Sequence, residues 1–418
     1  MIRTAAGLAV LCGAVLAGAA GAVGAAAAGS PLPAALIAGG VAEMLVATGG
    51  FVLLLRRSAW RMRLSLAVAV SLVAASAVAI GVPPAQPPAG PQPVAGQAFW
   101  QLPSGSVLRY VHITAASSGH PDPVVFLHGG PGVADLAGDA AYFGQLADDG
   151  YDVYVYDELG AGGSTRLADP TGYGLHRDAL DLEQIRRQIG AERLNLIGLS
   201  YGGHLAATYL AAHPEGVRRM VLLSPRSPDP HDTSAAGVQS RLDLARRLRT
   251  YAAVAAPRPL LAYALLQVNA RDAHALFPDA EADARNDLTL DLAEPALHCA
   301  GARYRHTGYR ASGFYRLQYP QSAAAPPIPD IRPRLAGDPT PTLIIKGQCD
   351  YLSWRSAMEY RRLLPRSELW YLRGAGHNVY QDQPAAVLAA IRAFLAGKPP
   401  VGQPYPGAAS PPDFQGPP

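Results

Sequence analysis

Hydrophobic residues follow two different patterns along this chain. Up to residue 82 they form three long runs, at residues 5–28, 34–55 and 64–82, in which the only charged residue is Glu43. From residue 99 onward they form short runs that alternate with segments of helical periodicity. Runs of about 18 or more apolar residues can cross a bilayer, whereas short runs suit strands and amphipathic helices. We therefore expect a membrane region at residues 1–82, followed by a globular domain.

The first apolar run has a second interpretation. It is mostly alanine and glycine, follows Arg3, and ends in an A-x-A pattern at residues 26–28. These features are also typical of a cleavable signal peptide, so we expect either two or three transmembrane helices. A buried helical hairpin of a soluble protein is a further alternative, which the length of the runs disfavours.

Arginines between the second and third runs indicate the orientation. The segment at residues 56–63 reads RRSAWRMR, whereas the connection at residues 29–33 carries no charge. The positive-inside rule puts the arginine loop in the cytoplasm, and the third run then delivers all that follows to the outer side. We therefore expect a protein of the cell membrane whose globular domain is extracytoplasmic, with or without cleavage of the first run.

Two segments are rich in proline. Residues 83–98 begin PPAQPPAGPQP, a composition that predicts an extended linker. Residues 399–418 have a similar composition, and we expect a disordered tail there.

The globular part alternates between predicted strands and predicted helices. Helical patterns occupy residues 175–189 and 205–212. Several of the strand runs are apolar at every position, as in parallel strands that helices cover on both faces. This alternation predicts a doubly wound α/β fold with a mostly parallel sheet. The predicted strands lie at residues 107–113, 124–127, 153–156, 194–199, 220–223, 343–345 and 369–372.

One long interval breaks this alternation. Residues 227–335 contain no convincing strand, but they contain helical patterns at residues 240–250 and 259–268. An insertion of this length between two strands predicts a helical cap over the site. The α/β core then comprises residues 99–226 and 336–398.

A serine lies inside a group of glycines where one strand meets a helix. Ser200 follows the strand at residues 194–199 in the sequence GLSYGG, which matches G-x-S-x-G in the strand-to-helix context that this motif requires. Glycines at 198 and 202 permit a sharp turn, and the turn exposes the hydroxyl at a helix N-terminus. The sequence predicts that Ser200 is a nucleophile; the alternative is an ordinary helix N-cap serine.

A nucleophilic serine needs a base, and the base needs a group that orients it. Asp350 follows the strand at residues 343–345, and His377 follows the strand at residues 369–372. The carboxyl ends of parallel strands share one edge of the sheet, and the order serine, acid, histidine is that of α/β-hydrolases. We therefore expect a Ser200–His377–Asp350 triad.

The loop HGGPG at residues 128–132 follows the strand at residues 124–127. A glycine-rich loop at this position can direct a backbone N–H at the oxyanion that forms during acyl transfer. We expect the amides of Gly130 and Tyr201 to be the oxyanion donors. The alternative is a simple Gly-Pro turn.

These motifs together carry a family resemblance. HGGPG, DELGAGGS from Asp157 to Ser164, GLSYGG, Asp350 and GAGH ending at His377 resemble the prolyl aminopeptidase branch of the α/β-hydrolases, which includes secreted tripeptidyl aminopeptidases. The resemblance covers roughly residues 99–395 without the cap. It implies serine-dependent hydrolysis at peptide N-termini, with no metal and no cofactor.

The second of these motifs, DELGAGGS, departs from the family pattern. The family usually has D-Q-R-G-x-G-x-S, and here Glu158 and Leu159 replace glutamine and arginine, which puts the substrate in doubt. The resemblance implies that acidic side chains hold the substrate's free amine. Candidates are Glu158, Glu281 and Glu294, beside the other cap acids Asp279, Asp283, Asp287 and Asp291; the alternative for each is a solvated helix face.

Composition narrows the remaining possibilities. A net charge of +3 over 418 residues, without a DNA-binding motif, gives no support for a nucleic-acid partner. Cys12 lies in the first apolar run. Cys299 and Cys349 would form a disulfide or remain buried thiols.

These observations predict a membrane-anchored serine hydrolase, foremost an aminopeptidase that acts on short peptides. An esterase or other small-acyl hydrolase is the first alternative, because one fold and one triad serve many reactions. A membrane-tethered binding protein without catalytic activity is the second.

Overall fold

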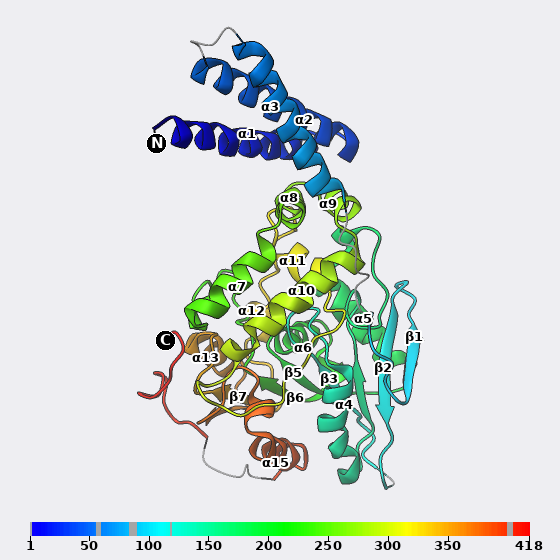
Figure 1. The fold of residues 1–418 in the computed structure, drawn as a ribbon. Helices are drawn as coiled ribbons and strands as arrows, with labels where there is room; N and C mark the ends of the chain where they lie inside the picture. The colour runs from blue at the N-terminus through cyan, green and yellow to red at the C-terminus, as the bar shows by residue number, and fades with distance from the viewer. Residues whose placement is uncertain (1, 56–59, 83–89, 118, 399–403) are drawn as a thin grey trace.

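The computed structural model describes residues 2–55, 60–82, 90–117, 119–398 and 404–418. Its first part consists of three helices, α1 (Ile2–Ala27), α2 (Leu32–Leu54) and α3 (Arg61–Gly81) (Figure 1). All three are long and apolar enough to cross a membrane, as the sequence predicts. Arg56 and Arg57 of the predicted cytoplasmic loop lie outside the described residues, as do residues 83–89 of the predicted linker.

Small residues bring α1 and α2 together. A Cβ atom on Gly39 would lie 2.6 Å from the carbonyl oxygen of Gly18, so a larger residue does not fit at this crossing. Glu43, the one charge within the apolar runs, is buried between the helices and accepts a hydrogen bond of 2.7 Å from the Ser76 hydroxyl of α3. Glu43 is therefore kept away from the outer surface of the three-helix bundle.

The second part is an α/β domain built on an eight-stranded sheet of order β1-β2-β4-β3-β5-β6-β7-β8. The strands are β1 (Gln97–Gln101), β2 (Val107–Ile113), β3 (Val124–Leu127), β4 (Val153–Tyr156), β5 (Leu194–Leu199), β6 (Val217–Leu223), β7 (Thr342–Gly347) and β8 (Ser367–Leu372). Strand β2 pairs antiparallel with β1 and β4, and the other neighbours are parallel. All seven predicted strands are confirmed. The sequence missed β1, a short edge strand with only partial burial.

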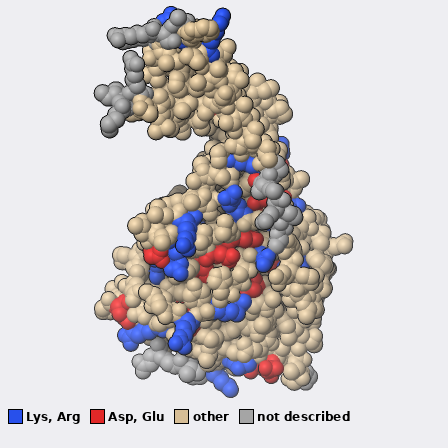
Figure 2. All heavy atoms as spheres, viewed as in Figure 1, with Lys and Arg blue, Asp and Glu red and all other residues tan. Residues whose placement is uncertain are grey.

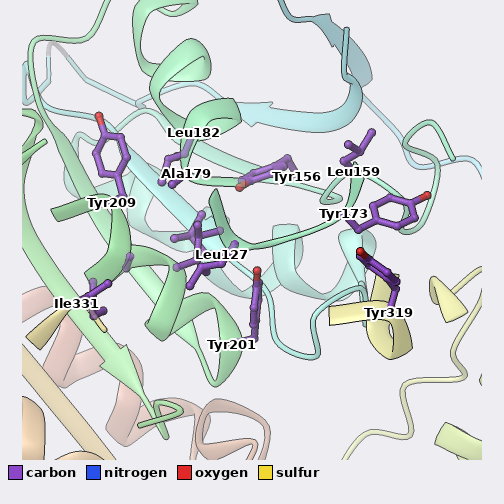
Figure 3. Close-up of a cluster of buried hydrophobic side chains, with 14 of the residues drawn as sticks. Leu127, Tyr156, Leu159, Tyr173, Ala179, Leu182, Tyr201, Tyr209, Tyr319 and Ile331 are labelled. Carbon is purple, nitrogen blue, oxygen red and sulfur yellow. The ribbon is translucent and has the colours of Figure 1, made fainter. Parts of the chain in front are cut away.

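Both faces of the sheet are covered. Along β5, Leu196 belongs to one buried cluster and its neighbour Ile197 to another, so side chains pack on both sides. Figure 3 shows part of the first cluster, where Tyr319 of the cap lies beside Tyr173 of the core. The covering helices are α4 (Leu136–Phe143), α5 (Leu175–Gln188), α6 (Tyr201–Ala212), α13 (Trp354–Leu363), α14 (Val379–Asp382) and α15 (Pro384–Leu395).

Between β6 and β7 the described residues 227–335 form helices and no strand. Figure 1 shows these cap helices between the N-terminal bundle and the sheet. They are α7 (Leu244–Val254), α8 (Pro257–Leu266), α9 (Ala270–Leu276), α10 (Asp279–Ala293), α11 (Phe314–Gln318) and α12 (Arg332–Leu335), with short 3₁₀ turns between some of them.

The C-terminal tail corrects the expectation of disorder. Residues 404–418 lie against the core, where the Tyr405 amide donates to the Leu369 carbonyl of edge strand β8 at 2.7 Å. The rings of Tyr405 and Phe414 pack at the Trp354 indole, with centroids 5.1 and 5.5 Å away. These aromatic rings give the proline-rich segment an apolar surface to bury, and the segment covers part of a sheet edge. Residues 399–403 lie outside the described part of the chain.

Candidate active site

The backbone around Ser200 forms a strained turn between β5 and α6. Ser200 has φ +53°, a left-handed value that is rare for a residue other than glycine. A Cβ atom on Gly198 would lie 2.3 Å from the Gly202 carbonyl oxygen, and one on Gly202 would lie 2.0 Å from the Leu127 carbonyl oxygen. The two glycines are therefore a steric requirement of the turn. A side chain at either position would collide with the neighbouring backbone, at the turn itself or at the end of β3.

Ser200 opens into a cavity of about 420 Å³ beneath the cap. His377 and Gly130 line the same cavity, so the edge of the sheet brings three of the five predicted catalytic and oxyanion residues to one wall. The opposite lining comes from the cap and is mostly polar and uncharged. It includes Gln239, Thr250, Asn286, Thr289, Thr307, Tyr309, Gln318 and Gln321.

Asp350 and His377 form a buried pair, with 2.7 Å between Oδ1 and Nδ1. The other carboxylate oxygen lies 2.7 Å from the Lys346 ammonium, which is completely buried. Burial alone would raise the pKa of Asp350, but Lys346 and His377 outweigh that effect and hold this pKa well below its usual value. Asp350 is therefore an ionised acceptor at neutral pH. Lys346 was not predicted as part of the site, because it is a single lysine in a mostly apolar strand.

Ser200 does not bond directly to His377 in the described structure. Tyr351 lines the cavity together with Ser200, and its ring centroid lies 4.5 Å from that of His377. Burial raises the pKa of Tyr351 to about 12, so this hydroxyl stays protonated. Ser200 and His377 line the same cavity without this bond, and catalytic hydrogen bonds are often incomplete in ligand-free enzymes.

The cap is fastened to the loops that carry Asp350 and His377. Cys299 of the cap forms a disulfide with Cys349, with 5.2 Å between the Cα atoms, which decides between the two expectations for these cysteines. The His377 amide donates to the Leu297 carbonyl at 2.6 Å. Buried His298 also pairs with Asp382 at 2.6 Å. The positions of Asp350 and His377 therefore depend on the cap segment around residues 297–299.

The glycine loop adjoins Ser200. A Cβ atom on Gly129 would lie 3.5 Å from that of Ser200, and Gly130 has φ +117° and lines the cavity. Tyr201 is the first residue of α6, where a backbone N–H has no acceptor within the helix. The amides of Gly130 and Tyr201 therefore belong to the two segments that border the serine.

Arg316 of the cap joins these two segments from behind, a contact that the sequence did not predict. It is the largest completely buried side chain, and its Nη2 contacts Glu158 at 3.2 Å, the Tyr201 hydroxyl at 3.0 Å, and Asp178. Glu158 accepts from the Gly132 amide at 3.1 Å, and Asp178 accepts from the Tyr201 hydroxyl at 2.5 Å. Burial raises the pKa of Glu158 and of Asp178 to about 7 despite the guanidinium.

None of the three glutamates predicted to bind an amine lines the cavity. Glu158 is engaged by Arg316 and Gly132. Glu281 pairs with Arg258 at 2.9 Å. Buried Glu294 accepts from the Thr307 amide at 2.8 Å.

Two aspartates that the sequence analysis did not select do line the cavity. Asp135 caps α4 and pairs with Arg305, and Asp139 is buried and accepts a 2.7 Å hydrogen bond from the Tyr380 hydroxyl. Burial raises the pKa of Asp139 well above its usual value. The signal that could have identified them is their position, three and seven residues after HGGPG, at the start of the helix that follows this glycine loop.

Within the described residues, no group of histidine, cysteine, aspartate or glutamate side chains is arranged to hold a metal ion. The expectation that the protein needs no cofactor stays a prediction.

Comparisons with known proteins agree with the fold. A family model described as alpha/beta hydrolase fold matches residues 122–384, more than half of the chain. The chain is 36% identical over 130 residues to a proline iminopeptidase of Lactobacillus delbrueckii subsp. bulgaricus, a match that covers 29% of this chain and 42% of that protein. A proline iminopeptidase of Heyndrickxia coagulans is 39% identical over 110 residues, which cover 26% of this chain and 36% of the relative.

The crystal structure of VinJ has a TM-score of 0.53 at 19% identity, covering 73% of this chain and 99% of VinJ. At this identity the similarity concerns the fold alone. The chain matches about two fifths of the length of the curated relatives.

Proposed function

This chain belongs to the α/β-hydrolase fold family, and from that premise we propose that it is a membrane-anchored serine hydrolase that releases N-terminal residues from short peptides. One observation carries the proposal. Ser200, on a strained turn, and His377, bonded to the ionised Asp350, line the same cavity. A nucleophile and a base in one cavity, with an acid bonded to the base, are what acyl transfer requires.

The proposed reaction has two halves. His377 Nε2 accepts the Ser200 proton as Oγ attacks the substrate carbonyl, and Asp350 keeps the proton on Nδ1 and stabilises the imidazolium. The amides of Gly130 and Tyr201 stabilise the tetrahedral oxyanion. The imidazolium then protonates the leaving amine, and water, activated by the same histidine, hydrolyses the acyl enzyme. The hydrogen bond between Ser200 and His377 must form when substrate enters.

Support for a peptide substrate comes from the relatives, which are named proline iminopeptidases. An aminopeptidase must recognise a free ammonium group. Among the described residues, Asp135 and Asp139 are the carboxyl groups that line the cavity, so we assign amine recognition to them in place of Glu158, Glu281 and Glu294. Asp135 is the stronger choice, because the raised pKa of Asp139 favours its neutral form.

Support for the location comes from two regions. The three apolar helices are candidate membrane spans, with Arg61 and Arg63 at the start of α3, on the side that the positive-inside rule assigns to the cytoplasm. The disulfide between Cys299 and Cys349 suits an oxidising compartment. Both features favour an extracytoplasmic catalytic domain.

A second candidate is an esterase that acts on a small neutral acyl compound. The observation that favours it is the lining of the cavity. Most of its polar groups are uncharged, and both of its carboxyl groups already have partners, Arg305 and Tyr380.

Labelling with a fluorophosphonate tests the catalytic proposal. Wild type should be labelled and Ser200→Ala should not; an unlabelled wild type would favour the non-catalytic binding protein. Aminoacyl amides with free and acetylated N-termini, compared with p-nitrophenyl esters, then distinguish the substrates. Equal cleavage of free and acetylated peptides would remove amine recognition, and cleavage of esters alone would favour the second candidate.

A further inference from the structure

Exposed apolar side chains are concentrated in one part of the cap. Among the described residues after residue 96, seven of the ten large apolar side chains that are exposed lie at residues 244–268. We call these seven residues the apolar cap face. They are Leu244, Leu248, Tyr251, Val254, Leu260, Tyr263 and Val268.

On α7 these side chains form a stripe that faces away from the protein. Leu244, Leu248 and Tyr251 follow the helical spacing i, i+4, i+7 and are 66%, 58% and 52% exposed. The buried residues of this helix, Thr250 and Ala253, lie on the opposite side. An ordinary surface helix has the reverse arrangement, with its apolar stripe against the core. The outward stripe of α7 therefore has no partner among the described residues.

The face continues onto α8, which lies against the N-terminal bundle. Leu260 and Tyr263 of α8 are about half exposed, while Leu261 and Leu265 on its inner side belong to the same buried cluster as alanines of α1 and α2. Arg258 of α8 donates to the carbonyl of Ile80 at the C-terminal end of α3. The apolar cap face therefore begins where the candidate membrane spans end.

The ends that meet the cap all belong to one side of the bundle. They are the end of α1, the start of α2 and the end of α3, since Ala22, Ala26, Ala35 and Ile80 make these contacts. If the helices cross a bilayer, this end emerges at one leaflet, and α8 lies at its surface. Figure 2 shows a hollow between the bundle and the cap, and Figure 1 shows α7 along its lower margin.

The chemistry of the face fits a lipid surface. Two of its seven residues are tyrosines, which favour the boundary between headgroups and acyl chains. Helix α7 also carries Arg247 and the exposed Arg249, whose guanidinium groups suit lipid phosphates, whereas Arg246 pairs with Asp243 at 2.7 Å. Apolar side chains on one side and basic ones beside them are typical of helices that lie in a membrane interface.

We infer that the apolar cap face binds the lipid surface of the leaflet from which the N-terminal helices emerge, so that the cap and its cavity are held at the bilayer. This inference rests on the proposed membrane anchoring of α1 to α3. It adds a second contact with the membrane, made by the domain that carries the cavity.

The test uses the full chain in nanodiscs that contain phosphatidylcholine and phosphatidylglycerol, at one copy per disc. In a Cys12→Ala background, Leu248→Cys and Tyr263→Cys are labelled with the environment-sensitive fluorophore NBD. Phe99→Cys, at an equally exposed position on edge strand β1, is the matched control. Nitroxide-bearing lipids should quench the probes at 248 and 263 roughly twofold more than the probe at 99.

Equal, weak quenching at all three positions in protein that remains in the discs would overturn the inference. A protein that does not enter the discs would instead contradict the anchoring itself, so the two failures are distinguishable. Replacing Leu244, Leu248 and Tyr251 together by glutamine should reduce quenching at 263 while fluorophosphonate labelling stays at the parent level. Unchanged quenching in this variant would count against the face as the lipid contact.

Discussion

The cap has an inner end around Arg316, which lies against the core, and an outer end at α7 and α8. Both ends depart from the usual distribution of side chains, in opposite ways. At the inner end, Arg316 is buried together with Glu158 and Asp178, although charged groups seldom lie inside proteins. At the outer end, Leu244 and Leu248 are exposed, although a helix normally buries such a stripe. A reversal of this kind indicates a specific task. The inner end borders the proposed oxyanion site, and the outer end borders the candidate membrane spans.

Removal of the buried charge of Arg316 should have the largest effect on stability and on the labelling rate. Arg316→Met leaves two buried carboxyl groups without their cation, and loss of one partner of a buried ion pair destabilises a protein by about 3–5 kcal/mol. It also frees Glu158 and Asp178, which hold Gly132 and the Tyr201 hydroxyl, so fluorophosphonate labelling should slow by about ten- to a hundredfold. Thermal unfolding in detergent and the labelling rate measure the two effects.

The matched control is Arg249→Met, at an exposed position on α7, which should change stability by less than about 0.5 kcal/mol. Adding Glu158→Gln and Asp178→Asn to Arg316→Met should restore part of the lost stability. If Arg316→Met were as stable and as reactive as wild type, the inner charge would have no structural task.

The disulfide that ties the inner end to the Asp350 loop should rank next. Cys299→Ser with Cys349→Ser opens a link across 50 residues, for which a loss of about 2–4 kcal/mol is expected. The labelling rate should fall as well, because Cys349 precedes Asp350 and the Leu297 carbonyl accepts from the His377 amide. Labelling of the variant at several temperatures, compared with wild type treated with a reductant, measures both. A variant with unchanged melting and labelling would show that the inner end needs no covalent tie.

The pH dependence of stability gives a smaller effect with a definite sign. The pKa of Glu158 and of Asp178 is raised to about 7, so the folded protein binds protons that the unfolded chain releases above about pH 4. This contribution to stability is complete below the unfolded pKa values and is lost as pH rises through 7. Asp350 has the opposite sign: its pKa is depressed, so its contribution is lost only as pH falls below about 4.

Glu158→Gln removes one of the two raised carboxyl groups and introduces the residue that the resembled family usually has here. Apparent melting temperatures between pH 5 and pH 8 should fall less steeply in this variant than in wild type. Between pH 5 and pH 8 the wild type should lose on the order of 1–3 kcal/mol more stability than the variant. Identical slopes would mean that Glu158 does not titrate in this range.

What the sequence could predict depended on local pattern. Ser200, Asp350 and His377 each follow an apolar run, so the parallel sheet had to bring them to one edge. Arg316 and Lys346 gave no such signal, because their burial depends on which distant segments pack around them. The same reason explains why Glu158 does not line the cavity: its partner Arg316 is far away in the sequence. Tertiary contacts of this kind leave no periodic pattern in the sequence.

The C-terminal tail was mispredicted for a related reason. Its proline content is a local property and predicts disorder, whereas its packing depends on single rings, Tyr405 and Phe414, that find Trp354 in the core. Burial of a few aromatic rings can offset the ordering of a short segment, and composition alone does not register it.

The smallest effect on stability should come from a substitution in the exposed stripe at the outer end of the cap. Leu248→Gln and Leu261→Gln make the same chemical change on neighbouring helices, but Leu248 is 58% exposed and Leu261 is 5% exposed. In detergent, Leu261→Gln should cost about 2–5 kcal/mol, because it removes buried apolar contacts and buries an amide. Leu248→Gln should change stability by less than about 0.5 kcal/mol, because nothing in the described protein packs on that side chain. A large loss in Leu248→Gln would mean that the outer stripe packs against protein, and the contrast between the two ends of the cap would then disappear.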